Sequence, residues 1–87
     1  MRSYQVYILR CSDGSLYTGC TNNMARRLAE HQSGKASRYT RSRLPVTLKY
    51  TEPALDRAAA LRREAQIKKM SRSAKLLLCA GSGAKPS

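Results

Sequence analysis

Five side chains in this sequence could share a chemical task if the fold brings them together. They are two phenols, a guanidinium, an imidazole and a carboxylate, which belong to Tyr7, Tyr17, Arg27, His31 and Glu64. A phenol, with its ordinary pKa of about 10, acts as a base at neutral pH only where nearby positive charge lowers that pKa. An imidazole, with an ordinary pKa of about 6.5, exchanges protons near neutral pH. The set is suited to moving protons beside an anion.

Each of these side chains also has an ordinary structural interpretation. The tyrosines fit half-buried residues of strands, Arg27 a solvated helix arginine, and His31 a helix histidine without a chemical role. The carboxylate is the most unusual of the five on pattern alone. Glu64 shares a helix face with Ala60 and Ile67, and a carboxylate on an apolar face needs a cation or a metal ion. A salt bridge to an arginine or lysine, here Arg27 or Lys68, is the alternative to a metal.

Alternating apolar residues and helix-capping residues predict a small α+β domain that must position these groups. Its elements follow the order strand, strand, helix, strand, helix, helix. The sheet is expected to be three-stranded and mainly antiparallel, with the helices flanking it. We expect Val46, Leu48 and Tyr50 to share one face of the third strand. The expected strands cover residues 4–10, 16–20 and 46–51, and the expected helices cover residues 24–33, 57–69 and 72–81.

Local signals mark the ends of these elements. Asn23 is expected to cap the first helix and so to support the site, and Pro53 to break the chain before the second helix. Residues 35–43 are expected to form a polar, cationic loop. The domain is expected to span residues 1–80, which leaves residues 81–87 as a flexible tail.

The loop of the first hairpin decides whether the two tyrosines meet. A two-residue loop would put Tyr7 and Tyr17 on opposite faces, whereas a three-residue loop with Gly14 in the left-handed conformation puts both on one face. In the longer loop Tyr17 pairs with Leu9 and Tyr7 with Gly19, which has no side chain and leaves space beside the phenol. We favour this register because it also gathers apolar side chains on the other face, where they can be buried.

Two strand motifs and two helix motifs together resemble the GIY-YIG nuclease superfamily. The motifs are Val6-Tyr7-Ile8, Tyr17-Thr18-Gly19, residues 23–31 and residues 63–68, in the order and spacing of that superfamily. The resemblance covers residues 4–75 and is closest to the small stand-alone, single-domain branch, which is related to the catalytic domain of the excision-repair endonuclease. It implies the GIY-YIG endonuclease fold, phosphodiester hydrolysis and a connection with DNA repair.

The resemblance also implies a role for each of the five side chains. Tyr7 and Tyr17 would bind or deprotonate the attacking water, and the sequence leaves open which of them is the base. Arg27 would pair with the phosphate through its planar guanidinium, and His31 would exchange a proton with a tyrosine or with water. Glu64 would hold a single Mg²⁺ or Mn²⁺, since Mg²⁺ is often bound by one or two carboxylates plus phosphate.

Charge indicates the class of partner. The net charge is +12, from 17 Lys and Arg against 5 Asp and Glu, which favours an anionic polymer. We expect nucleic acid, DNA rather than RNA, and no membrane partner, because no long apolar stretch is present. A homodimer or a partner protein that supplies specificity stays open. The residues expected to contact nucleic acid are Lys35, Arg38, Tyr39, Arg41 and Arg43.

Other interpretations fit part of the sequence. The same scaffold without catalysis would be a nucleic-acid-binding module, and the charge alone also fits a basic structural protein that associates with RNA. Cys11, Cys20 and Cys79 form neither a zinc pattern nor an even disulfide set, so we expect reduced thiols. With no signal peptide in view, a cytoplasmic location is expected.

Overall fold

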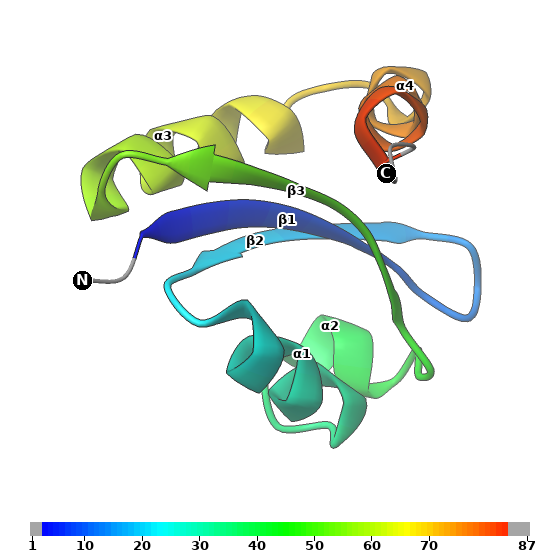
Figure 1. Ribbon diagram of the computed structural model, residues 1–87. Helices are drawn as coiled ribbons and strands as arrows, with labels where there is room; N and C mark the ends of the chain where they lie inside the picture. Colours follow the sequence, from blue (N-terminus) through cyan, green and yellow to red (C-terminus); the bar gives the residue numbers. More distant parts are fainter. Residues whose placement is uncertain (1–2, 84–87) are drawn as a thin grey trace.

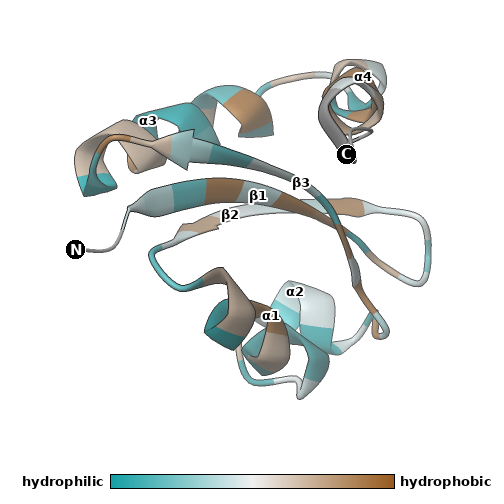
Figure 2. Cartoon of the chain, in the orientation of Figure 1, coloured by the Kyte–Doolittle hydropathy of each residue, from teal (hydrophilic) through white to brown (hydrophobic). Residues whose placement is uncertain are grey.

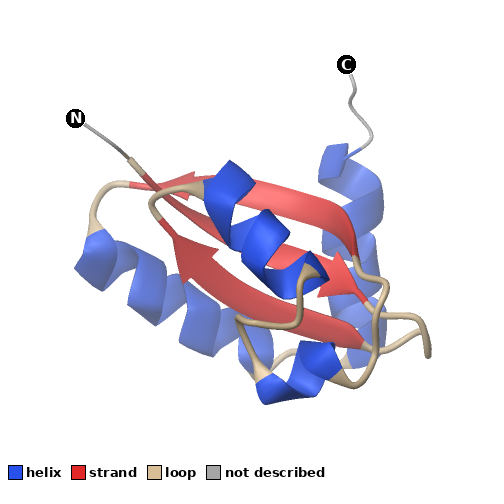
Figure 3. Cartoon of the chain, turned by 90° about the horizontal axis from the view of Figure 1, so that it is seen from below, coloured by secondary structure: helices blue, strands red, loops and turns tan. Residues whose placement is uncertain are grey.

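A three-stranded antiparallel sheet with the strand order β2-β1-β3 forms the centre of the fold. The computed structural model describes residues 3–83 (Figure 1). Helices α1 and α2 lie on one face of the sheet, and α3 and α4 lie on the other (Figure 1, Figure 3). The predicted α+β class and sheet are therefore confirmed. The elements are β1 (Tyr4–Arg10), β2 (Leu16–Thr21), α1 (Met24–Gln32), α2 (Arg38–Arg41), β3 (Thr47–Ala54), α3 (Arg57–Lys68) and α4 (Arg72–Gly83).

The first hairpin has the register that the three-residue loop predicts. Tyr7 pairs with Gly19, and Leu9 pairs with Tyr17. Gly14 has a φ of 86°, a left-handed conformation that costs glycine little because it lacks a Cβ. Both phenols therefore lie on the face of the sheet that α1 covers.

The central strand β1 is buried on both faces, so the molecule has two hydrophobic clusters. Figure 2 shows apolar segments along β1, between the two helical layers. Burial of these side chains is the main stabilising term for a domain of this size. The cluster beneath α3 contains Val6, Ile8, Tyr50, Ala60 and Ile67. The cluster beneath α1 contains Tyr7, Leu9, Cys11 and Val46.

A β-bulge in β3 divides its apolar residues between these two clusters. Ile8 pairs with Tyr50 and Leu9 pairs with Leu48, so Lys49 is the extra residue. An extra residue reverses the side-chain alternation beyond it. Leu48 consequently packs in the cluster beneath α1, while Tyr50 belongs to the cluster beneath α3. The expectation that all three apolar residues of this strand share one face is therefore wrong.

The third strand also continues through its proline. Pro53 pairs with Gln5 within β3, and the strand ends at Ala54. The expected break at Pro53 is wrong because β3 is an edge strand, where a residue without an N–H is tolerated. Helix α3 begins after Asp56, whose carboxylate accepts a hydrogen bond of 2.8 Å from the N–H of Ala59.

The segment after α1 is more ordered than the predicted loop. It contains the short helix α2, which begins after Ser37, whose hydroxyl accepts a hydrogen bond of 3.0 Å from the N–H of Tyr39. Helix α4 continues to Gly83, beyond its predicted end, and residues 84–87 of the predicted tail lie outside the described residues. None of the helices described between residues 3 and 83 has the length and apolar character needed to span a membrane.

A polar cluster ties α3 to the edge strand β3. The guanidinium of Arg63 donates to both carboxylate oxygens of Glu52, over 2.8 and 3.2 Å. The hydroxyl of Tyr50 donates to the same carboxylate. These partners raise the pKa of the Arg63 guanidinium, chiefly through the hydrogen bond to Glu52. The two-point contact fixes how α3 is rotated about its axis, and hence where the next residue, Glu64, points.

Candidate active site

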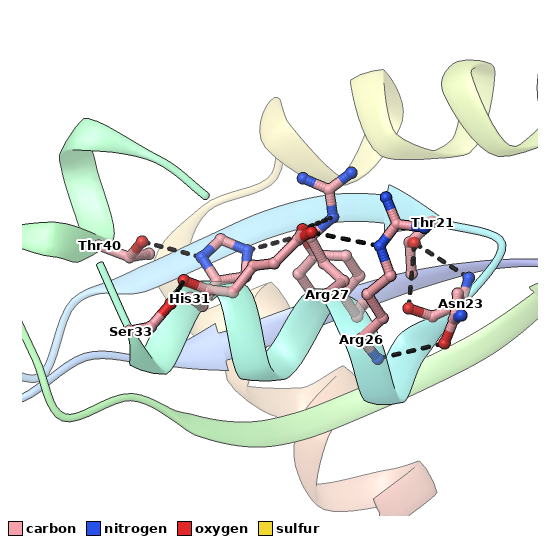
Figure 4. A network of polar contacts seen from close by, with 9 residues as sticks. Thr21, Asn23, Arg26, Arg27, His31, Ser33 and Thr40 are labelled. Carbon is pink, nitrogen blue, oxygen red and sulfur yellow. Dashed lines mark hydrogen bonds and ion pairs between the residues drawn. The ribbon is translucent and has the colours of Figure 1, made fainter. Parts of the chain in front are cut away.

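The innermost part of the site is a chain of hydrogen bonds that begins at Tyr7. This side chain is 2% exposed, and its hydroxyl lies 2.9 Å from Nε2 of His31. On the other side of the imidazole, Nδ1 lies 2.8 Å from the hydroxyl of Thr40 (Figure 4). The Thr40 hydroxyl donates to the carbonyl of Ser37. It therefore accepts from Nδ1–H, which leaves Nε2 of a neutral His31 to accept the proton of Tyr7.

Burial keeps this chain of groups neutral. It raises the pKa of Tyr7 far above its ordinary value, and the neighbouring Tyr17 raises it further. The positive charge of Arg27 opposes this rise, and Glu64 adds to it. Burial, followed by the charge of Arg27, lowers the pKa of His31. A phenolate at Tyr7 therefore needs more positive charge than the protein alone provides.

A cluster of aromatic rings extends from His31 toward the surface. The ring centroids of Tyr17 and His31 are 5.2 Å apart, and those of Tyr17 and Tyr7 are 6.5 Å apart. Tyr39 of α2 stacks on Tyr17 at 5.9 Å, and the guanidinium of Arg43 lies over the Tyr39 ring, 3.9 Å from its centroid. Helix α2 thus supplies both the outer aromatic residue and, one residue later, the hydroxyl that orients His31.

Gly19 is buried, and the Tyr7 ring itself fills the space that the missing side chain leaves. A Cβ at this position would lie 2.5 Å from the hydroxyl of Tyr7 and 2.6 Å from its Cζ. No side chain fits there, so the pairing predicted between Gly19 and Tyr7 is also a steric requirement. Gly19 belongs to β2, which is an edge strand of the sheet.

Arg27 projects from α1 on the same side of the molecule (Figure 4). Asn23 caps this helix, because its side-chain oxygen accepts a hydrogen bond of 3.1 Å from the N–H of Arg26. The Nε of Arg27 lies 3.6 Å from a carboxylate oxygen of Glu30, which also pairs with Arg26 at 3.3 Å. Arg27 is half-exposed, and its charge acts on Tyr7, His31 and the thiol of Cys20. It is therefore central to the electrostatics of the site.

Glu64 reaches the site from α3, across the edge of β2. Its side chain is 17% exposed, and one oxygen lies 2.8 Å from Nζ of Lys68. The structure thus contains the lysine salt bridge that the sequence left open as an alternative. Burial, and then a hydrogen bond to Glu64, raise the pKa of Cys20 to about 11. Glu64 also raises the pKa of Tyr7, so its charge acts on groups of both faces of the sheet.

The basic segment from residue 35 to residue 43 divides into two groups. The Arg43 guanidinium donates to Asp13 at 3.1 Å and to the carbonyl of Tyr39 at 2.9 Å, so its main contacts are within the protein. Lys35, Arg38 and Arg41 are exposed and take part in no ion pair among the described residues. They are the cations of this segment that a ligand can reach.

Sequence reasoning missed Thr40, which is fully buried and completes the hydrogen-bond chain. The only available signal was its place beside Tyr39 in a short capped segment. Within residues 3–83 no cluster of three or more His, Cys, Asp or Glu could bind a metal ion, so Glu64 is a lone carboxylate. The arrangement combines a proton-accepting chain with a half-exposed guanidinium and one carboxylate near the edge of β2.

Comparisons with known proteins identify the family of the chain. The family model described as the GIY-YIG catalytic domain matches residues 3–76. A UPF0213 protein of Halobacterium salinarum is 49% identical over 83% of this chain and 94% of its own. A UPF0213 protein of Streptococcus sanguinis is 54% identical over 82% of each chain.

Two solved structures are also similar. The solution NMR structure of a UPF0213 protein from Bacillus halodurans has a TM-score of 0.60 and 43% identity, and the match covers 97% of this chain and 88% of that one. The solution NMR structure of a protein from E. faecalis has a TM-score of 0.65 and 36% identity, over 100% of this chain and 93% of that one. From the family match, which spans nearly the whole chain, and from these relatives, the chain belongs to the GIY-YIG catalytic domain family.

Proposed function

We propose that this protein is a metal-dependent endonuclease that hydrolyses phosphodiester bonds, with DNA as its substrate. Membership of a nuclease family supports the reaction class. The observation that carries the proposal is the convergence of groups from both sides of the sheet at the edge of β2. Tyr7 and Arg27 belong to the α1 side and Glu64 to the α3 side, and the charges of Arg27 and Glu64 both act on Tyr7 and on the neighbouring thiol of Cys20.

The protein's own groups can bind the phosphate and remove a proton from water. Arg27 binds a phosphate oxygen with its planar guanidinium, where negative charge increases in the transition state. The hydroxyl of Tyr17 has no hydrogen-bond partner among the described residues and is available to hold the attacking water. As that water attacks, its proton moves to the oxygen of Tyr7, and the proton of Tyr7 moves to Nε2 of His31. The tyrosine ends neutral, and the histidine carries the positive charge.

Glu64 fits a single Mg²⁺ or Mn²⁺. Mg²⁺ is commonly bound by one or two carboxylates together with substrate phosphate, so a lone carboxylate beside a phosphate-binding arginine is sufficient. In the protein described here Lys68 neutralises that carboxylate. A bound metal ion would lower the pKa of the attacking water and so ease the transfer of its proton to Tyr7. The lysine must then move from the carboxylate oxygen that it contacts.

The same lysine favours one competing function. With Glu64 paired to Lys68 and the pKa of Tyr7 raised by burial, the scaffold could bind nucleic acid without cutting it. The exposed cations Lys35, Arg38 and Arg41 serve either function, because phosphate contacts need only positive charge. Cleavage separates the two functions, and binding does not. The cytoplasmic location and the connection with DNA repair stay predictions from the sequence.

The decisive experiment measures cleavage and binding on the same substrates. Duplex, flapped, branched and single-stranded DNA, with RNA counterparts, are incubated with Mg²⁺, with Mn²⁺ and with chelator. We expect metal-dependent cutting that Glu64→Gln abolishes while the dissociation constant stays within about twofold. Glu30→Gln is the matched control, since it removes the same charge from α1 and should cut at least as fast as the wild type. Equal activity of Glu64→Gln and the wild type would refute the proposed role of Glu64.

A further inference from the structure

A second basic surface lies on the face of the sheet opposite α1. It is a groove of about 450 Å³ between α4 and the hairpin end of the sheet. Three cations from three different elements line it: Arg10 of β1, Lys49 of β3 and Arg72 of α4. Lys49 is the bulge residue of β3, and its charge acts on the thiol of Cys79 in the groove, where it opposes the effect of burial on the pKa of that thiol.

The charge of this groove is not neutralised by the protein. The sequence contains five acidic residues, all of them in the described part of the chain. Four of them form ion pairs with other arginines or lysines, and Asp56 caps α3. None of them lines the groove. Three uncompensated cations around one cavity repel one another, and a bound anion relieves that repulsion.

The rest of the groove lining is apolar. It includes Leu16, Leu76 and Cys79, and Leu76 is 42% exposed. A small inorganic anion uses the cations alone, whereas a nucleotide also places a sugar and a base edge on apolar surface. The cavity volume is within the range of sites that hold one small organic group, about 300–1,000 Å³. A convex duplex does not enter a cavity of this size, but a flexible single strand does.

We propose that this groove binds a single-stranded segment of nucleic acid that continues from the substrate at the candidate active site. Arg10, Lys49 and Arg72 contact backbone phosphates, and the leucines contact sugar and base. The inference rests on the proposed function in taking nucleic acid as the ligand, but it does not require cleavage. The groove and the Tyr7 site lie on opposite faces of the sheet. A substrate that reaches both therefore places a duplex or a strand at the Tyr7 site, and a single-stranded arm passes from there around the edge of the sheet to the groove.

The test compares two double variants with the same loss of charge. Lys49→Gln/Arg72→Gln alters the groove, and Arg62→Gln/Lys69→Gln removes one lysine and one arginine from exposed positions at α3. Both are made in a Glu64→Gln background, and binding is measured by fluorescence anisotropy on a blunt duplex and on the same duplex with a single-stranded tail. The single-stranded tail should tighten binding by the wild-type groove, and we expect the groove variant to lose this gain in affinity. The slope of log affinity against log salt concentration on tailed DNA should decrease in magnitude by about 1.4, or 0.7 per lost contact.

A second measurement locates the ligand directly. In a Cys20→Ser background Cys79 is the partly exposed thiol, since Cys11 is buried. Tailed DNA should slow alkylation of Cys79 severalfold, and blunt duplex should not. Equal behaviour of the two double variants, or unchanged alkylation, would overturn the proposal. It would also be overturned if the groove variant lost binding to phosphatidylserine vesicles but not to tailed DNA. If the wild-type protein does not cut DNA but the single-stranded tail still tightens its binding, the proposed endonuclease activity is rejected and the proposed binding groove is supported.

Discussion

Replacement of Gly19 by alanine tests the geometry of the site most directly. The added Cβ would lie 2.5 Å from the hydroxyl of Tyr7 and 2.6 Å from its Cζ, well inside van der Waals contact. The Tyr7 ring is 2% exposed and packed between β1 and α1, so it cannot move without disturbing its neighbours. Overpacking of this kind typically costs about 1–3 kcal/mol of unfolding free energy.

A second cost arises from the hydrogen bond that the displaced phenol would lose. The 2.9 Å contact between Tyr7 and His31 is buried, and a buried polar group without a partner costs about 1–3 kcal/mol. The two costs overlap, because one movement of the ring causes both, so we expect a total of about 2–4 kcal/mol. With about 4–8 °C per kcal/mol for a domain of this size, Gly19→Ala should lower Tm by roughly 8–32 °C.

The assay is urea unfolding monitored by circular dichroism, with Gly81→Ala as the matched control. A Cβ at Gly81 would meet nothing within 4 Å, and this residue lies in α4. Alanine is favoured over glycine in a helix by about 0.5–1 kcal/mol, so the control should be slightly stabilised. The same chemical change thus has opposite signs at the two positions. A Gly19→Ala protein within about 1 kcal/mol of the wild type would refute the steric reasoning.

Three further predictions follow from individual contacts. Burial and the nearby guanidinium of Arg27 lower the pKa of His31, so the imidazole binds a proton more tightly in the unfolded chain than in the folded one. The free energy of unfolding is therefore highest above the ordinary pKa of histidine and decreases as the pH falls below that value. His31→Gln should flatten this loss in urea midpoints compared at about pH 7.5 and about pH 5.5. Lys68→Met removes the ammonium group that competes with a metal ion for the Glu64 carboxylate. Because such helix pairs contribute about 0.3–0.5 kcal/mol, Mn²⁺ titrations should show about twofold tighter binding, and weaker binding would contradict this. Arg63→Ala should cost about 1–2 kcal/mol in urea unfolding, whereas Arg26→Ala at an exposed pair should change stability by less than about 0.5 kcal/mol.

The sequence was sufficient for the parts of the fold that depend on local patterns. The hairpin register followed from the need to bury one face of the sheet together with a glycine that fits the left-handed position, and it placed Tyr7 opposite Gly19. The cap at Asn23 followed from its short polar side chain. These features involve residues close in the chain, so their physics is visible in a short window of sequence.

Features that depend on distant partners were not predictable in this way. The bulge at Lys49 follows from how β3 fits against β1, and Pro53 stays in the strand because β3 lies at an edge. In the candidate site, the hydroxyl of Thr40 meets His31 through the packing of α2 on α1. The involvement of Arg43 with Asp13 joins residues from two separate loops. No spacing rule in the sequence specifies such contacts.

The two edge strands of the sheet, β3 and β2, differ in regularity. Along β3, the outer edge carries a bulge at Lys49 and a proline at position 53, two features that hinder the addition of another strand. Assembly of copies into a continuous intermolecular sheet is therefore disfavoured on that side, and a dimer of this protein must use other surfaces. Along β2, the other edge strand, the pairing with β1 is regular and residues 16–21 include no proline. A strand from a ligand would therefore pair more readily at β2 than at β3.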